Sequence, residues 1–166
     1  MAKAVKTNVL RHLDAAKIPY ETIEYDVSDE NYDGKRIAQK SGLPMHMVYK
    51  TLVLMGDRSP VGSKHQYLVC VIPVDRELDL KAVARASGHK AVAMLPQKEL
   101  LPLTGYVRGG CSPIGMKKAF PTYIQADAQA LTRISVSAGV RGCQVILAVD
   151  ALADCTRAVF AELCEK

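Results

Sequence analysis

Short apolar runs of strand length, separated by glycine, proline and polar residues, constrain the fold of this chain more than any other sequence feature. The clearest are residues 50–54, 67–72 and 143–149, which are rich in Val, Ile and Leu. Runs of this length and composition are typical of strands buried in a sheet. All are far shorter than the roughly 18 apolar residues of a membrane-spanning helix, and the N-terminus lacks the apolar core of a signal peptide. We therefore expect no membrane segment.

Amphipathic helical patterns lie between these runs, each with its own start or stop signal. Apolar residues at helical spacing after Thr7, a good N-cap, predict a helix over residues 7–17. Further helices are expected over 33–41 with Gly42 after it, from Asp79 to Gly88, from Pro96 to Leu101, and from Asp150 through Leu152, Val159, Phe160 and Leu163, with a short helical turn over 45–48. A glycine after the last helical residue favours these ends, because it adopts the left-handed conformation at little cost.

Other segments carry the β-branched and aromatic residues typical of strands, namely 20–27, 91–95, 121–125 and 133–137. Helices and strands alternate early in the chain, whereas the second half is rich in strands. We find no internal repeat and no linker. The pattern predicts a single α+β domain, residues 1–166, built on a mixed β-sheet.

The composition is that of an ordinary globular protein, which excludes disorder and coiled coil. Of the 166 residues 49% are hydrophobic and 23% are charged, and a chain of this length can bury a core without a disulfide or a metal. The five cysteines are odd in number, form no C-x-x-C pair and have no histidine at metal-ligand spacing. We therefore expect reduced thiols and a cytoplasmic location.

The net charge of +5 is unevenly distributed along the chain. Residues 100–149 hold five basic side chains against one acidic side chain, whereas residues 18–34 hold six acids and no base. A local basic surface favours a phosphate-bearing partner. The alternative is a solvated surface that binds no ligand.

A glycine-rich segment, G-G-C-S-P-I-G at residues 109–115, lies inside the basic stretch. Its glycines allow a ligand to approach the backbone closely, so that consecutive N–H groups can bind a phosphate or an oxyanion. The segment matches neither the Walker motif nor the dinucleotide-binding motif. A purely structural turn between strands is the alternative.

Two reactive side chains stand near these features. Cys111 lies within the glycine-rich segment, but no histidine is identifiable as its base, which makes it a weak candidate nucleophile. Lys50 opens an apolar strand beside Thr51, where its ammonium could neutralise a phosphate or polarise an ester carbonyl; a solvated lysine at a sheet edge is the alternative. A second glycine-bearing connection, residues 137–142, carries Arg141, and its alternative is a plain hairpin turn.

Several of these segments together resemble the YbaK family of Cys-tRNA(Pro) deacylases, relatives of the editing domain of bacterial prolyl-tRNA synthetases. The matching segments are V-Y-K-T-L at 48–52, P-V at 73–74, L-D-L-K at 78–81, T-G-Y-V-R-G-G-C-S-P-I-G-M-K-K at 104–118, F-P-T at 120–122 and V-S-A-G-V-R-G at 136–142. The similarity extends from about Thr7 to Val149, and the 104–118 block is its most specific part. It implies a strongly bent mixed β-sheet flanked by helices.

The resemblance also implies trans-editing, in which a separate enzyme deacylates the Cys-tRNA(Pro) that prolyl-tRNA synthetase makes because cysteine is about the size of proline. In this family the thiol of the substrate is thought to attack the ester, so the enzyme supplies no nucleophile, metal or cofactor. The implied partners are the acceptor end of tRNA(Pro) and prolyl-tRNA synthetase, without DNA or a membrane. The alternatives are an Ala-tRNA(Pro) deacylase of the same superfamily and a non-catalytic module that binds tRNA or a nucleotide.

Carried over by position, the resemblance makes Lys50 the catalytic residue, which would hold the terminal phosphate or the ester. The residues that it assigns to substrate binding are Tyr25, Tyr32, Thr51, Gly109, Gly110, Ser112, Pro113, Gly115, Ser137, Gly139, Arg141 and Gly142. Either tyrosine could stack on the terminal adenine.

The chain also departs from the family pattern in three places. Val140 stands where the family usually has Lys, which removes one positive charge from the basic surface. Ile146 lies near a position that is often acidic, which puts a substrate contact there in doubt, and the loop of residues 57–66 is longer than usual. With so small a basic surface we expect weak tRNA binding by the protein alone, and tRNA specificity that depends on the synthetase.

Overall fold

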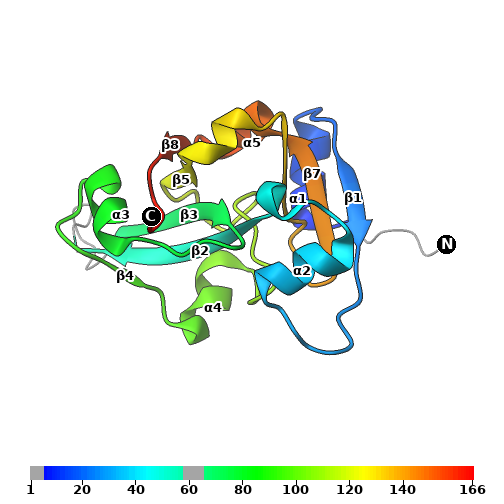
Figure 1. Cartoon of the computed structure of the whole chain (residues 1–166), viewed down its shortest axis with the longest axis horizontal. Coiled ribbons are helices and arrows are strands. Elements are labelled where there is room, and N and C mark those ends of the chain that lie inside the picture. The colour runs from blue at the N-terminus through cyan, green and yellow to red at the C-terminus, as the bar shows by residue number, and fades with distance from the viewer. Residues whose placement is uncertain (1–5, 58–65) are drawn as a thin grey trace.

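The computed structural model describes residues 6–57 and 66–166, and the strands of this part of the chain form two adjacent sheets (Figure 1). The first sheet is antiparallel with the order β1 (Glu21–Glu24), β7 (Cys143–Ala148), β6 (Arg133–Ser137). The second has the order β4 (Val92–Met94), β2 (Tyr49–Gly56), β3 (Gln66–Pro73), β5 (Thr122–Gln125), β8 (Val159–Ala161). Its first three strands pair antiparallel and its last three pair parallel, which makes the sheet mixed.

A single β-bridge between Val48 and Ser135 connects the two sheets at the start of β2. The bridge brings β2 against β6, so the pair of sheets behaves as one mixed sheet with a sharp bend. This arrangement confirms the predicted α+β class and the mixed sheet.

Helices lie against the sheets. Several of them begin and end at the residues that the sequence predicted. The α-helices are α1 (Asn8–Ala15), α2 (Gly34–Ser41), α3 (Leu80–Ser87), α4 (Leu100–Thr104) and α5 (Val149–Thr156), and the short 3-10 helices are η1 (Met45–Met47), η2 (Gln97–Glu99) and η3 (Ala126–Ala130). The Thr7 hydroxyl accepts a hydrogen bond from the Leu10 N–H, and the Asp79 carboxylate accepts from the first turn of α3. Gly42 and Gly88 end α2 and α3 in the left-handed conformation, which confirms these predictions.

The prediction for the C-terminal helix is wrong. Ala148 rather than Asp150 is the N-cap, and α5 ends at Thr156, followed by the C-cap residue Arg157, whose φ is 56°. Val159 and Phe160 lie in β8, which pairs with β5, and Leu163 is buried in a separate core cluster. Val159 and Phe160, a β-branched and an aromatic residue, favour a strand at this position. The backbone groups at the edge of β5 pair with them, and a longer helix would leave those groups without partners. Pro96 likewise precedes η2, and α4 begins only at Leu100.

The main hydrophobic core lies between α1 and one face of the antiparallel sheet. Val9 and Leu13 of α1 are fully buried there against Val136 and Val145. Because side chains alternate along a strand, the neighbouring residues Ser137 and Gln144 lie on the opposite face. These two polar residues form the floor of the cavity described below.

No helix in the described ranges is long and apolar enough to cross a membrane. The long loop expected at residues 57–66 falls almost wholly on residues 58–65, which lie outside the described part of the chain.

Candidate active site

A cavity of about 360 Å³ lies where the two sheets meet. Its walls come from the start of α2, the first half of β2, the segment after β4 and the glycine-rich segment, with β6 and β7 below. The polar, charged or thiol-bearing side chains among its lining residues are Tyr32, Asp33, Tyr49, Lys50, Thr51, Gln97, Arg108, Cys111, Ser137 and Gln144. The bend between the sheets therefore gathers residues from distant parts of the chain around one small space.

Lys50 reaches this cavity from β2 with a side chain that is about three-quarters buried. Its Nζ lies 3.7 Å from Oε1 of Glu77, whose carboxylate is largely exposed. An ion pair with an exposed partner is worth little, because water and salt screen it. A phosphate or an ester oxygen of a ligand can therefore replace Glu77 as the partner of Lys50.

Thr51 lines the cavity beside Lys50 and carries an unused hydroxyl group. The Oγ1 atom is buried, yet it has no hydrogen-bond partner among the described residues. A buried polar group without a partner costs roughly 1–3 kcal/mol of folding free energy. Such a group is most simply explained by a ligand that supplies the missing hydrogen bond.

The first half of the glycine-rich segment faces the cavity and packs without any room for side chains. A Cβ on Gly109, where φ is 86°, would lie 2.8 Å from the Tyr32 side chain. A Cβ on Gly110 would lie about 3 Å from the backbone of Val140 and Arg141, in the second glycine-bearing connection. Only glycine allows the two connections to lie this close together.

Arg141 ties the two connections to Tyr32. Its guanidinium lies over the Tyr32 ring, 4.1 Å from the ring centroid, and its Nε donates to the carbonyl of Arg108 over 2.8 Å. Arg141 is not among the lining residues of the cavity, whereas Tyr32 and Arg108 are. The position of Tyr32 at the cavity is thus held by Arg141 on one side and by Gly109 on the other.

The second half of the glycine-rich segment is buried against α1 instead. Ser112 is completely buried, and its Oγ accepts a hydrogen bond from the Ile114 N–H. The Gly115 carbonyl accepts from Asn8 Nδ2, and Pro113 also lies outside the cavity lining. Among the residues predicted to bind substrate, these three lie away from the cavity and hold the segment in place.

Ser137 is the one member of the second connection that lines the cavity among its described residues. Gly139 has a φ of 93° and lies so close to α1 that a Cβ would be 2.8 Å from Val9. Gly142 lies against the carbonyl of Tyr25 and accepts a hydrogen bond from its N–H. Both glycines therefore shape the connection without reaching the cavity.

Tyr25 is not among the residues that line the cavity. Its side chain is buried, and burial raises the pKa of its hydroxyl, against the opposing influence of Gly142 and Gln144. The hydroxyl makes no hydrogen bond of ordinary geometry with the described residues. A stacking contact with a ligand in the cavity is therefore available to Tyr32 but not directly to Tyr25.

Sequence reasoning missed five polar residues of the cavity wall, which are Asp33, Tyr49, Gln97, Arg108 and Gln144. Gln144 is almost fully buried, and its Oε1 accepts a hydrogen bond from Ser135 Oγ. A signal was present, because glutamine is unexpected inside a strand that is otherwise apolar. Ile146, the expected departure, is buried and does not line the cavity.

Cys111 lines the cavity, but its thiol is poorly suited to attack a carbonyl. Burial raises the pKa of this thiol to about 12, so it stays protonated near neutral pH.

Over residues 6–57 and 66–166, no group of three or more His, Cys, Asp or Glu side chains is placed to hold a metal ion.

Comparison with known proteins gives one family match that covers most of the chain. The family described as the aminoacyl-tRNA editing domain matches residues 30–155. A protein of Enterococcus faecalis (strain ATCC 700802 / V583), provisionally named the Cys-tRNA(Pro)/Cys-tRNA(Cys) deacylase EbsC, is 45% identical over 161 residues. The match covers 97% of this chain and 94% of the relative.

Two solved structures share the fold. The first, provisionally described as a trans-editing enzyme for prolyl-tRNA synthetase, has a TM-score of 0.81, 21% identity and full coverage of both chains. The second, a hypothetical protein designated APE2540, has a TM-score of 0.83 and 18% identity over 96% of this chain and 100% of its own. At these identities the likeness supports the fold alone.

Proposed function

Because the chain belongs to the aminoacyl-tRNA editing domain family, we propose that it is a trans-editing enzyme that deacylates Cys-tRNA(Pro). The name of the 45% identical relative supports this substrate class. The observation that carries the proposal is a cavity in which Lys50 and the unpartnered Thr51 hydroxyl lie together, while the Cys111 thiol beside them is protonated. Such a site can orient and polarise an ester but lacks an activated nucleophile of its own.

The substrate is proposed to supply the nucleophile. The cysteine sulfur attacks the carbonyl carbon of its own ester, so that a C–S bond forms and the C–O bond to the ribose breaks. The thiol proton passes to the departing ribose oxygen, and the products are uncharged tRNA and a cysteine thiolactone. The step consumes no water and needs no oxidant or reductant.

The residues of the cavity divide between binding and charge stabilisation in this proposal. Lys50 holds the terminal phosphate or the developing negative charge on the carbonyl oxygen. The Thr51 hydroxyl donates the hydrogen bond that it lacks in the free protein. Tyr32, held by Arg141, stacks on the terminal adenine, and Gly109 allows the CCA end to approach the backbone.

The acceptor end of tRNA(Pro) is the proposed ligand, and prolyl-tRNA synthetase is the proposed partner. The cavity is large enough for the terminal nucleotide and its amino acid but not for an extended stretch of RNA. Selection of the tRNA body therefore depends on the synthetase, and an activity on freshly mischarged tRNA agrees with a cytoplasmic location.

The test is a deacylation panel with purified substrates. Cys-tRNA(Pro), Cys-tRNA(Cys), Ala-tRNA(Pro) and Ser-tRNA(Pro) are incubated with the protein, with and without prolyl-tRNA synthetase, and loss of the amino acid is followed. We expect rapid loss of cysteine and slow loss of alanine and serine, because only cysteine has a thiol. Preferential loss of alanine contradicts the thiol mechanism. Binding without loss of any amino acid contradicts the enzyme and favours a tRNA-binding module.

A further inference from the structure

Asp33 is the one carboxylate among the described residues that line the cavity, and it has no assigned role. It precedes α2 at the N-cap position, where aspartate ordinarily accepts a hydrogen bond from the first turn of the helix. Here the Asp33 side chain makes no such bond. Asp33 is exposed, and a carboxylate that borders a cavity and leaves its own helix uncapped is free for a ligand.

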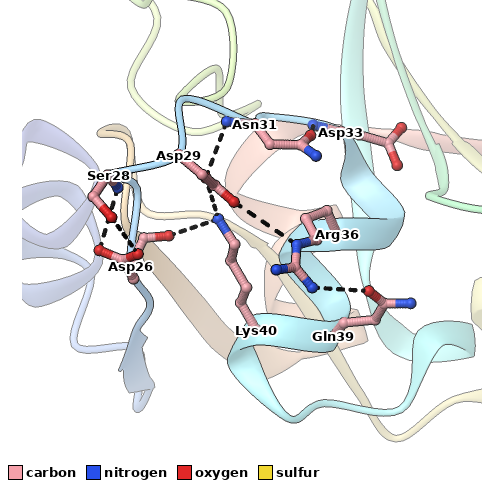
Figure 2. A network of polar contacts seen from close by, with 8 residues as sticks. All are labelled: Asp26, Ser28, Asp29, Asn31, Asp33, Arg36, Gln39 and Lys40. Atoms are coloured by element: carbon pink, nitrogen blue, oxygen red, sulfur yellow. Dashed lines mark hydrogen bonds and ion pairs between the residues drawn. The ribbon is translucent and has the colours of Figure 1, made fainter.

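Two of the three cations of α2, Lys40 and Arg36, are already engaged elsewhere, and the third, Lys35, is exposed. Lys40 Nζ contacts Asp29 Oδ1 and donates to the Asp26 carbonyl over 2.9 Å, and its side chain is only 10% exposed. Arg36 Nε lies 3.8 Å from the same Asp29 carboxylate, and Arg36 also donates to Gln39 Oε1. Figure 2 shows both cations turned toward Asp29, with the Asp33 carboxylate pointing away from them. Asp33 has no ion-pair partner within the described ranges.

The backbone around Asp33 is fixed on both sides. Tyr32 is held between Gly109 and Arg141, as described above. Gly34 lies so close to Val74 that a Cβ there would be 2.8 Å from the Val74 side chain. The Asp33 N–H donates to Asn31 Oδ1 over 3.1 Å. The backbone position of Asp33 at the exposed rim of the cavity is therefore set by its neighbours before any ligand binds.

From this geometry we infer that Asp33 binds the α-ammonium group of the aminoacyl ester, an inference that rests on the proposed function. An aminoacyl-tRNA terminus carries a cationic amine on one side of the ester and anionic phosphates on the other. The cavity carries charges opposite to both of these groups. The negative charge of Asp33 lies on the wall before α2, and the positive charges of Lys50 and Arg108 lie on other walls. The carboxylate fixes the amino acid by its amine and leaves the side chain free to turn toward the ester.

The experiment compares two esters and two variants. The substrates are Cys-tRNA(Pro) and the same tRNA acylated with 3-mercaptopropionate, which keeps the thiol and the ester but lacks the amine. The variants are Asp33→Asn and, as a matched control, Glu30→Gln, which removes an exposed carboxylate from the same loop outside the cavity lining. The asparagine substitution preserves the shape of the side chain, and the folding of each variant is checked by its circular dichroism spectrum.

We expect Asp33→Asn to lower kcat/KM for the cysteinyl ester by about fivefold, because water screens the contact of an exposed carboxylate with an ammonium group. For the 3-mercaptopropionyl ester it should stay within about twofold of wild type, and Glu30→Gln should match wild type on both. An equal loss on both esters, or no loss on either, overturns the assignment.

A binding measurement separates this inference from the proposed function. The probes are the non-hydrolysable amide 3′-(cysteinylamino)-3′-deoxyadenosine and its counterpart without the amine. Wild type should bind the first more tightly, and Asp33→Asn should remove the difference, even if no deacylation is found. Equal affinity of wild type for both probes, or binding of neither, contradicts the role of Asp33, whereas failure to deacylate Cys-tRNA(Pro) contradicts only the proposed function.

Discussion

The two halves of the glycine-rich segment serve different purposes although they are continuous in sequence. In residues 109–111, here called the cavity half, Gly109 and Cys111 line the cavity, which also contains the unpartnered Thr51 hydroxyl. Residues 112–115, here called the anchor half, are tied to α1 and to Tyr106, whose hydroxyl donates to the Ile114 carbonyl. A buried polar group without a partner indicates a place where a ligand can bind. Polar groups that are already hydrogen-bonded within the protein hold the segment in position.

The largest effect on activity is expected from Lys50→Ala at the cavity. The substitution should lower kcat/KM for Cys-tRNA(Pro) by about 100-fold or more, because a cation that stabilises developing charge is worth that much in catalysis. The unfolding free energy should change by less than about 0.5 kcal/mol, since the Glu77 contact is exposed. Lys81→Ala, at an exposed lysine of α3, is the control. Near wild-type turnover of Lys50→Ala shows that the site lies elsewhere.

The largest effect on stability is expected from Gly115→Ala in the anchor half. At a φ of 74° a Cβ would lie 2.9 Å from His12 and 3.0 Å from the Tyr106 hydroxyl. The left-handed backbone and the forced contact together should lower the unfolding free energy by about 2–4 kcal/mol, as measured by urea denaturation. The folded fraction should keep most of its kcat. An unchanged midpoint of denaturation contradicts the supporting role of this half.

Thr51→Val should separate stability from activity. Replacing an unpartnered buried hydroxyl with a methyl group should raise the unfolding free energy by about 1 kcal/mol and the melting temperature by about 2–4 °C. It should also lower kcat/KM about fivefold, the value of one neutral hydrogen bond. Thr104→Val is the matched control, because the Thr104 hydroxyl already donates to the Leu100 carbonyl. The control should destabilise the protein, and equal effects at both threonines contradict a ligand-facing role for Thr51.

The smallest effect is expected from Cys111→Ala, although this residue belongs to the cavity half. The thiol is protonated near neutral pH because burial raises its pKa to about 12, so its removal should leave kcat/KM within about threefold of wild type. Iodoacetamide should react slowly with this residue for the same reason. A collapse of activity in the variant revives a covalent mechanism through Cys111.

Local interactions made most of the secondary structure predictable. The caps at Thr7 and Asp79 and the glycine ends of α2 and α3 depend on residues within one helical turn, which a sequence pattern contains. The C-terminal helix failed because Val159 and Phe160 pair with β5, more than thirty residues earlier. No pattern within the segment records that an open sheet edge lies beside it.

The candidate site was predictable to the extent that its motifs are contiguous. Lys50, Thr51, Tyr32, Gly109 and Ser137 do line the cavity, whereas Ser112, Pro113 and Gly115 share a motif with Gly109 but lie outside the lining. Asp33 has the sequence features of an ordinary helix cap. Only the folded chain shows that its side chain leaves the helix uncapped and that the residue lines the cavity.

The sequence by itself determined the short strands, the capped helices and the two glycine-bearing connections, because each depends on the conformational preferences of a few neighbouring residues. Only the tertiary structure decided which of those residues meet. Asp33, Lys50, Arg108 and Gln144 lie up to 111 positions apart, and they share one cavity because the bridge between Val48 and Ser135 bends the two sheets around it. Long-range strand pairing brings them together, and pairing partners depend on the whole fold rather than on any local pattern.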